Sequence, residues 1–276
     1  MPVTYHGHQY LAADAHAHIY PEKIAEKATA SVGNFYGIPM EHIGLPQILS
    51  QTGGQAGFDR FLVCSVATKV EQVRTINTFI QQACAQYPQF VGLAAWHPDI
   101  TQLEAELDDI QNRGLKGIKL HPDFQEFAID DPKMFPFYQA VQRRGLPILF
   151  HTGDNRKHFS SPLQLAHVLD KLPELTCIAA HLGGYTQWHE ARQCLSGMNL
   201  YVDTSSSLGF IPKKEALESI AHFGVDHVMF GTDFPMWNIE NELETFFSLG
   251  LTEKENQTIL YDTFANLFRL PKSEEY

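Results

Sequence analysis

Two histidines separated by a single residue, His16 and His18, are the residues of this chain best suited to binding a metal ion. They follow Asp14, and successive side chains of a β-strand alternate between its two faces. We therefore expect Asp14, His16 and His18 to project from one face of a strand. Two imidazoles on one face can converge on a single ion such as zinc.

The spacing of this pair is weak support by itself. The chain holds 14 histidines, and a second pair with the same spacing, His6 and His8, occurs upstream. We interpret His6 and His8 as part of a disordered polar tail at the surface. Stronger support for a metal site must come from the elements that position other donor residues.

Short apolar segments alternate along the chain with segments of helical periodicity. The predicted strands are 10–14, 61–67, 90–96, 117–120, 147–150, 177–180, 200–202 and 225–230. Several are apolar throughout, which is typical of parallel strands covered on both faces. Helix start signals lie between them at 101–104, 131–132 and 161–162. This repetition over 276 residues predicts an α/β fold, a (β/α)8 TIM barrel.

Two parts of the chain do not fit the repeat of strand and helix. Residues 19–60 form an insertion after the first strand, with a helix expected at about 21–31, and we expect a lid over the barrel mouth. Two helices at about 252–261 and 262–270 are expected to close the chain. Because no linker rich in Pro, Gly or Ser divides it, residues 1–276 are expected to form a single domain.

Residues that can bind metals or transfer protons follow the ends of several predicted strands. Active sites of TIM barrels lie at the carboxyl ends of the strands, which all meet at one mouth. Besides the pair on the first strand, these ends carry His97, His121, His151, His181 and Asp233. The sequence therefore predicts one site built from several strands.

The motifs at these strand ends resemble those of the amidohydrolase superfamily. They are Asp14-x-His16-x-His18, Gly117-Ile118-Lys119-Leu120-His121-Pro122, His151-Thr152-Gly153, His181-Leu182-Gly183-Gly184 and Gly231-Thr232-Asp233-Phe234-Pro235. The likeness covers nearly the whole chain. It is greatest for the amidohydrolase-related branch that contains aminocarboxymuconate-semialdehyde decarboxylase and related decarboxylases and hydrolases.

This resemblance implies a ligand set for one divalent metal. His16, His18 and His151 would bind the ion, with Asp233 as a further ligand or close neighbour. Three imidazoles and a carboxylate suit Zn²⁺, and Mn²⁺, Ni²⁺ or Fe²⁺ could occupy the same site.

The resemblance also implies catalytic roles. A water on the metal would lose its proton near neutral pH, and Asp233 would accept that proton and pass it to the leaving group. His181 would polarise the substrate oxygen or act as an acid or base. Asp14 would orient a ligand histidine or cap a turn.

Lys119 bears on the number of metals. Binuclear members of the superfamily carry a carboxylated lysine at the end of the fourth strand. Lys119 shares a strand face with His121 but lies two residues further from the mouth. We therefore expect Lys119 to lie one layer too deep for that role, and the site to hold one metal.

Candidate substrate contacts follow the later strands. Arg156 could hold a substrate carboxylate in its guanidinium fork, or it could be a solvated arginine of the loop. His121, Trp237 and Phe210 could form pocket walls, or they could be packing residues.

Composition excludes other classes of function. The formal net charge is −12, and Lys and Arg form no cluster beyond short pairs, so nucleic-acid binding is not expected. No apolar run is long enough to cross a membrane, and no signal peptide is recognisable. The four cysteines are far apart and are expected to be reduced thiols in a cytoplasmic protein. A homodimer is plausible for such a barrel.

Two reactions on a small-molecule substrate are compatible with this site. The first expectation is metal-dependent hydrolysis of a C–N or C–O bond in a small cyclic or carboxylate-bearing substrate. The alternative is non-oxidative decarboxylation of an unsaturated or aromatic carboxylic acid.

Overall fold

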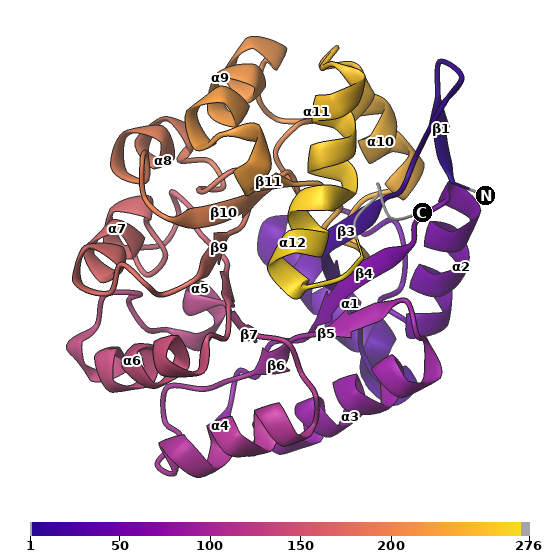
Figure 1. The fold of residues 1–276 in the computed structure, drawn as a ribbon. Helices are drawn as coiled ribbons and strands as arrows, with labels where there is room; N and C mark the ends of the chain where they lie inside the picture. Colours follow the sequence, from indigo (N-terminus) through magenta and orange to yellow (C-terminus); the bar gives the residue numbers. More distant parts are fainter. Residues whose placement is uncertain (1, 272–276) are drawn as a thin grey trace.

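The computed structural model describes residues 2–271, which form a ring of parallel strands surrounded by helices (Figure 1). In chain order, the strands of the ring are β3 (Ala13–His18), β4 (Arg60–Cys64), β5 (Phe90–Gly92), β6 (Ala94–Ala95), β7 (Ile118–Leu120), β8 (Ile148–Phe150), β9 (Cys177–Ala179), β10 (Leu200–Asp203) and β11 (Val228–Met229). They pair in parallel as β3-β4-β5 and as β6-β7-β8-β9-β10-β11. β5 and β6 are two halves of one predicted strand, which bonds to β4 through its first half and to β7 through its second.

Backbone hydrogen bonds connect the last strand to the first. The amide of Ala15 donates to the carbonyl of Phe230 over 2.8 Å, and that of His18 donates to the carbonyl of Phe234. An isolated parallel bridge joins Ala17 and Phe234. These contacts place β3 beside β11, as the predicted (β/α)8 TIM barrel requires.

One helix follows each strand of the barrel on its outer side. These are α2 (Pro46–Ala56), α3 (Val73–Gln86), α4 (Leu103–Asn112), α6 (Phe135–Arg144), α7 (Pro162–Lys171), α8 (Trp188–Cys194), α9 (Lys213–Phe223) and α10 (Ile239–Phe247). At 161–162 the predicted start is confirmed, because Ser161 caps α7 in a capping box with Gln164. The box predicted at 101–104 does not form: Gln102 is the N-cap of α4, and its side chain makes no capping bond.

Buried apolar side chains lie on both faces of the strands. Phe61, Val63 and Phe150 belong to the large core that also contains residues of the outer helices. Leu62 and Leu149 belong to a second core, inside the ring. This division explains why the strand sequences are apolar throughout.

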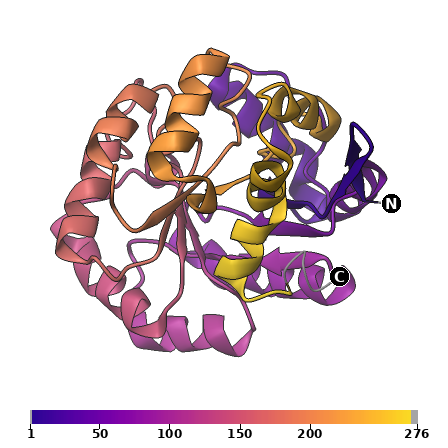
Figure 2. The same cartoon turned by 45° about the horizontal axis from the view of Figure 1, so that its top comes forward.

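The C-terminal helices close one end of the ring. α11 (Glu253–Gln257), a π-helical turn (Thr258–Asp262) and α12 (Thr263–Phe268) follow one another without a break. Tyr261, Phe264 and Phe268 pack in the inner core. In Figures 1 and 2, α12 (yellow) crosses the end of the ring opposite to α1 (Glu22–Tyr36). The two C-terminal helices predicted from the sequence are confirmed. The structure shows that their aromatic side chains fill one end of the barrel.

Residues 19–60 differ in part from the expected insertion. α1 extends to Tyr36, further than the helix expected at about 21–31. The segment that contains Gly53 forms α2, whose contacts are with α10, and Gly53 lies directly against the ring of Phe61. α2 is therefore an outer helix of the barrel, and only the part around α1 can serve as a lid.

The N-terminal segment is also different from the prediction. β1 (Val3–Tyr5) and β2 (His8–Tyr10) form an antiparallel hairpin whose turn contains His6 and Gly7. His8 Nε2 forms an ion pair of 2.8 Å with Glu253 of α11. His6 and His8 are thus part of an ordered hairpin rather than a disordered tail, and the first barrel strand begins at Ala13, not at residue 10.

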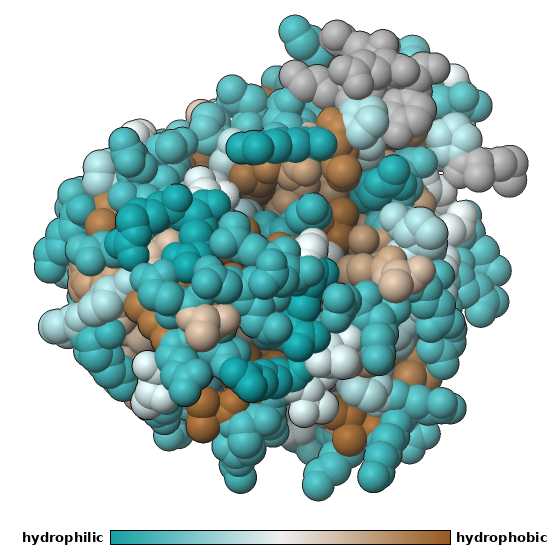
Figure 3. Space-filling model, turned by 60° about the horizontal axis from the view of Figure 1, so that its bottom comes forward, coloured by the Kyte–Doolittle hydropathy of each residue, from teal (hydrophilic) through white to brown (hydrophobic). Residues whose placement is uncertain are grey.

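The outer surface is largely hydrophilic. The face in Figure 3 is covered mainly by hydrophilic side chains, with hydrophobic residues in separate small groups. Among the described residues, no helix has both the length and the hydropathy needed to cross a membrane.

Candidate metal centre

A cavity of about 420 Å³ lies at the carboxyl ends of the barrel strands. The predicted site residues that line it are His16, His18, His121, His151, His181 and Asp233. The lid segment contributes Ile24, Val32 and Tyr36 to its wall. The structure therefore brings together residues that are up to 217 positions apart in the sequence.

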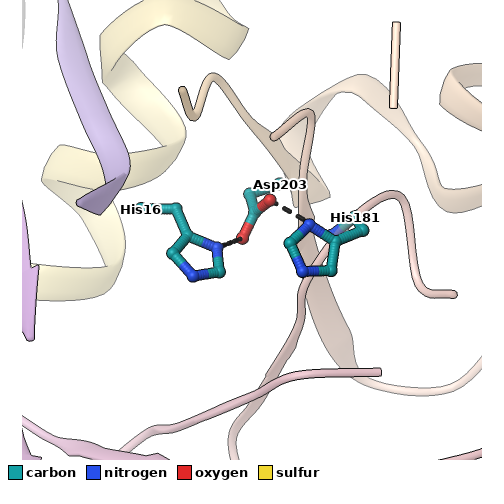
Figure 4. A group of neighbouring side chains, drawn as sticks. All are labelled: His16, His181 and Asp203. Atoms are coloured by element: carbon teal, nitrogen blue, oxygen red, sulfur yellow. Dashed lines mark hydrogen bonds and ion pairs between the residues drawn. The ribbon is translucent and has the colours of Figure 1, made fainter. Parts of the chain in front are cut away.

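The ring of His16 is oriented from behind by Asp203, the last residue of β10. His16 Nδ1 lies 3.1 Å from Asp203 Oδ2, and the backbone amide of His181 donates to Asp203 Oδ1 over 3.2 Å (Figure 4). Because a carboxylate only accepts hydrogen bonds, His16 must carry its proton on Nδ1. The lone pair of His16 is then on Nε2, as in a metal ligand held by a carboxylate.

His16, His18 and Asp233 form a group of three potential metal donors. His16 Nε2 lies 3.2 Å from His18 Nε2, and Asp233 Oδ1 lies 3.8 Å and 3.5 Å from these two nitrogens. One donor atom from each residue lies within 4.8 Å of the other two. This donor set of two imidazoles and a carboxylate fits a divalent metal.

His151 and His181 form a second pair of imidazoles in the cavity. His181 Nδ1 lies 3.0 Å from the carbonyl oxygen of Ser205, which only accepts, so this nitrogen carries the proton. His181 Nε2 then accepts from His151 Nδ1 over 3.1 Å. His151 Nε2 keeps a lone pair and, within residues 2–271, has no hydrogen-bond partner. This nitrogen lies 3.7 Å from Asp123 Oδ2, and His151 belongs to a second group of potential donors, with His121 and Asp123, so its role as a ligand beside His16, His18 and Asp233 stays a prediction.

Asp233 is held through one carboxylate oxygen, so that its other oxygen faces the histidines. Ser206 Oγ donates to Asp233 Oδ2 over 2.6 Å, and Trp237 Nε1 donates to Ser206 Oγ over 2.8 Å. The backbone at Asp233 and His181 is left-handed, with φ of 61° and 62°. Such conformations are costly for residues with a side chain and occur where the surroundings enforce them, often at functional sites.

Burial favours the neutral forms of His18, His151 and His181. Burial lowers the pKa of His18 and His151 well below the usual value, and the neighbouring cationic groups lower it further. Burial is also the main reason why the pKa of His181 falls to about 4. Burial would raise the pKa of Asp233, but the surrounding imidazoles outweigh it and hold that pKa below its usual range. Neutral imidazoles and a carboxylate are the forms that bind metals.

Asp14 does not share a strand face with the two histidines as expected. The pairing register between β3 and β4 shifts between Asp14 and Ala17, so a β-bulge interrupts the alternation of side chains. Asp14 instead accepts hydrogen bonds from the amide and hydroxyl of Thr232, over 2.9 and 2.5 Å. It also accepts from the amide of His16 over 3.0 Å. Asp14 therefore ties the strand end of His16 to the loop of Asp233, and it lies outside the cavity wall.

Lys119 reaches further towards the mouth than its position on the strand suggests. Its Nζ atom lies 3.1 Å from His16 Nε2, and the side chain lines the cavity although it is only 1% exposed. The expectation that Lys119 lies a layer too deep is wrong, because the long side chain spans that layer. The number of metals stays a prediction.

The structure does not bring Arg156 or Trp237 into the cavity wall. Arg156 forms a two-pronged ion pair with Asp154, at 2.9 and 2.6 Å, and its Nη1 donates to the carbonyl of Phe35. The guanidinium is thus already paired. Trp237 acts on the site through Ser206, and Phe210 packs on Trp237 with 47% of its surface exposed.

Sequence reasoning missed Asp203 and Tyr36. The polar run Asp203-Thr204-Ser205-Ser206, directly after an apolar strand, is a signal that could have indicated Asp203. Tyr36 lies on the lid helix, far from any strand end, and its hydroxyl lies 3.1 Å from His121 Nε2. No local pattern of the sequence indicates that contact.

The sequence and the fold were compared with known proteins. The sequence model of the family described as Amidohydrolase matches residues 13–270. Gamma-resorcylate decarboxylase from Polaromonas sp. (strain JS666 / ATCC BAA-500) is 22% identical in an alignment of length 253 that covers 72% of this chain and 77% of that protein.

Two solved structures are similar in fold. The dihydroxybenzoic acid decarboxylase from Polaromonas sp. JS666, with bound manganese and the inhibitor 2-nitroresorcinol, has a TM-score of 0.74 and 16% identity over 97% of this chain and 99% of that one. The 5-carboxyvanillate decarboxylase LigW from Sphingomonas paucimobilis has a TM-score of 0.73 and 13% identity over 95% of this chain and 100% of that one.

Proposed function

Because this chain belongs to the amidohydrolase family, we propose that it is a metal-dependent decarboxylase of an aromatic or unsaturated carboxylic acid. The three similar proteins described above are decarboxylases, which favours the alternative over the hydrolysis expected first from the sequence. The same resemblance supports a small-molecule substrate. The absence of disulfides among Cys64, Cys84, Cys177 and Cys194 agrees with a cytoplasmic location.

The observation that carries this proposal is the chemistry of the cavity wall. Most of the wall is apolar, with Ile24, Val32, Phe124 and Met236 among its residues. The histidine cluster and Lys119 lie together, and Lys119 is the one Lys or Arg side chain among the residues that line the described cavity. An apolar volume that ends at a cationic, metal-binding group suits a flat acid whose carboxylate points towards that group.

His16, His18 and Asp233 would hold the metal, with His151 as a fourth ligand. We propose Zn²⁺, which prefers such nitrogen and oxygen ligands, and Mn²⁺ as the alternative because the similar Polaromonas structure contains it. When bound, the metal supplies positive charge that stabilises the negative charge developing on the substrate. The residues behind the site keep the ligands in place: Asp203 holds His16, and Ser206 holds Asp233.

Decarboxylation replaces a C–C bond by a C–H bond. The bond between the ring carbon and the carboxylate breaks, CO₂ leaves, and the electron pair that stays on the ring carbon takes up a proton. We propose that Asp233, an ionised carboxylate in the free site, takes this proton from water and passes it to the ring carbon, because its Oδ1 faces the cavity cluster while Oδ2 is held by Ser206. His181, bonded to the carbonyl of Ser205 through Nδ1 and to His151 through Nε2, would reach a polar substrate atom only after its bond to His151 breaks, and its catalytic role stays a prediction.

Release of CO₂ tests this proposal. The metal-loaded protein is incubated with aromatic acids, 2,6-dihydroxybenzoate among them, and with small cyclic esters and amides. CO₂ and the decarboxylated ring are expected from at least one acid, and Asp233→Asn is expected to lower that rate at least 100-fold. Opening of a cyclic ester or amide without any CO₂ from the acids would overturn the proposal in favour of hydrolysis.

A further inference from the structure

The lid helix places the hydroxyl group of Tyr36 beside a histidine of the cavity wall. Tyr36, at the C-terminal end of α1, lines the cavity, and its Oη atom lies 3.1 Å from His121 Nε2. The ring of Tyr36 packs among Phe124 and Tyr185, at centroid distances of 6.2 and 5.8 Å. The hydroxyl is therefore held at a defined position by the lid and by the barrel together.

This pair retains an unused hydrogen-bond donor. The phenol carries one hydrogen and the neutral imidazole carries one, but Tyr36 and His121 share a single hydrogen bond. If Tyr36 donates, the hydrogen of His121 is on Nδ1, a buried atom without a partner among residues 2–271. If His121 donates, the Tyr36 hydroxyl hydrogen is free. Only in the second case is the unused donor on Tyr36, which lines the cavity, and there the hydroxyl hydrogen and a lone pair of Oη can both bond to a ligand.

The charges around Tyr36 indicate which kind of substrate group can bind beside it. The cation of the wall, Lys119, contacts His16, whereas Tyr36 contacts His121. Burial raises the pKa of Tyr36 well above its usual value, so the phenol stays protonated. A neutral substituent of the substrate that both donates and accepts hydrogen bonds therefore suits Tyr36 and His121 better than a second carboxylate on the substrate does.

We propose that Tyr36 and His121 form a polar subsite that binds a hydroxyl substituent on the ring of the substrate, and that Tyr36 determines this specificity. The proposal rests on the proposed function, because it takes the substrate to be an aromatic acid. It adds that a residue of the lid, rather than of the barrel, recognises the hydroxyl substituent.

Arg156 positions Tyr36 in this arrangement. Its guanidinium lies 5.1 Å from the ring centroids of both Phe35 and Tyr36, and its Nη1 donates to the carbonyl of Phe35 over 3.1 Å. Asp154, which pairs with the same guanidinium, is fully buried. Arg156 thus links the end of α1 to the loop after β8 without contacting the cavity.

Binding of matched ligands tests the subsite. Dissociation constants of the metal-loaded protein are measured by calorimetry for benzoate and for 2-, 3- and 4-hydroxybenzoate. At least one hydroxybenzoate is expected to bind about tenfold more tightly than benzoate, which is the effect of one good hydrogen bond. Tyr36→Phe is expected to reduce this ratio to about one.

The control is Tyr185→Phe, which removes a hydroxyl from a ring that touches Tyr36 but is not part of the cavity wall. This variant is expected to keep the wild-type ratio. A wild-type protein without preference, an unchanged ratio in Tyr36→Phe, or an equal loss in Tyr185→Phe would each overturn the subsite. If Tyr36→Phe does not fold, as judged by its circular dichroism, His121→Leu carries the same test.

Binding is measured separately from turnover, so the two proposals can fail independently. If no acid releases CO₂ but the Tyr36-dependent preference is present, the decarboxylase proposal fails and the subsite stands. If CO₂ is released from hydroxylated and unsubstituted acids alike, and Tyr36→Phe changes neither binding nor rate, the subsite fails and the decarboxylase stands.

Discussion

Asp203 is a single residue that supports two histidines of the candidate centre at once. One carboxylate oxygen faces His16 Nδ1, the other accepts from the amide of His181, and Ser205 Oγ donates to the same carboxylate. Burial would raise the pKa of Asp203, but His16 and its other partners lower it overall, so the carboxylate stays ionised. An ionised partner behind the ring makes His16 Nε2 a better ligand.

We predict that Asp203→Asn weakens metal binding about 10- to 100-fold, the usual effect of removing a carboxylate behind a ligand histidine. Affinity is measured by competition with a chromophoric chelator. Asp226→Asn, at an exposed carboxylate far along the chain, is the matched control and is expected to bind metal as the wild type does. Equal affinities for both variants would contradict the assigned role of Asp203.

At the scale of elements, a few contacts hold the C-terminal end of α1 on the barrel. The helix ends at Gly37, which adopts a left-handed conformation with φ of 68°, and Arg156 holds the preceding turn. The contacts of Arg156 lie between the lid and the loop after β8. They are therefore expected to govern how often the end of the lid opens.

We predict that Arg156→Ala increases hydrogen exchange in the segment 22–36 several-fold and leaves exchange in the barrel strands unchanged. The measurement is exchange followed by mass spectrometry of the peptides that cover α1. Arg143→Ala, which removes an exposed ion pair with Glu104 on the outer helices, is the control. If exchange in α1 is the same in both variants, Arg156 does not hold the lid.

α12 contributes to stability because it fills the end of the barrel. Phe264 is 1% exposed and packs with Phe268 in the inner core. We predict that Phe264→Ala lowers the free energy of unfolding by about 3–5 kcal/mol, the usual cost of deleting a buried phenyl ring. Phe210→Ala, at a ring with 47% exposure, is expected to cost less than about 1 kcal/mol. Urea denaturation measures both, and similar losses would show that α12 is not part of the core.

At the scale of the whole molecule, one carboxyl outside the cavity wall couples stability to pH. Burial raises the pKa of Glu242 to about 8, and the charges of Asp233 and Asp14 add to the effect. The folded protein therefore holds this proton up to about pH 8, whereas the unfolded chain releases it near the ordinary pKa of 4.5. The stabilising effect of the proton is complete below pH 4.5 and is lost as the pH rises through 8.

We predict that Glu242→Gln makes the free energy of unfolding less dependent on pH between about 4.5 and 8. The difference between variant and wild type is expected to grow by at least about 1 kcal/mol in favour of the variant over this range, since each unit of pKa shift corresponds to about 1.4 kcal/mol. Glu244→Gln, an exposed position of the same helix α10, is the control. Parallel pH profiles for wild type and Glu242→Gln would exclude this coupling.

The barrel could be predicted because its signals are local. Each strand is an apolar run, each helix has its own periodicity and start signal, and parallel strands must present their carboxyl ends at one mouth. That rule was sufficient to place His16, His18, His151, His181 and Asp233 in one cavity, as the structure shows. The strand boundaries were less certain, because β3 contains a bulge and the hairpin before it resembles a polar tail in composition.

The sequence predicts the fold class and the candidate donors of the metal centre, whereas packing in three dimensions sets which side chains meet. The sequence does not show that Asp154 already pairs with Arg156, that Lys119 reaches His16, or that the lid brings Tyr36 to His121. Residues 36 and 121 are 85 positions apart, and their contact depends on how α1 packs over the barrel. Periodicity reports which face of an element is buried, but only packing determines the partner that a polar side chain finds there.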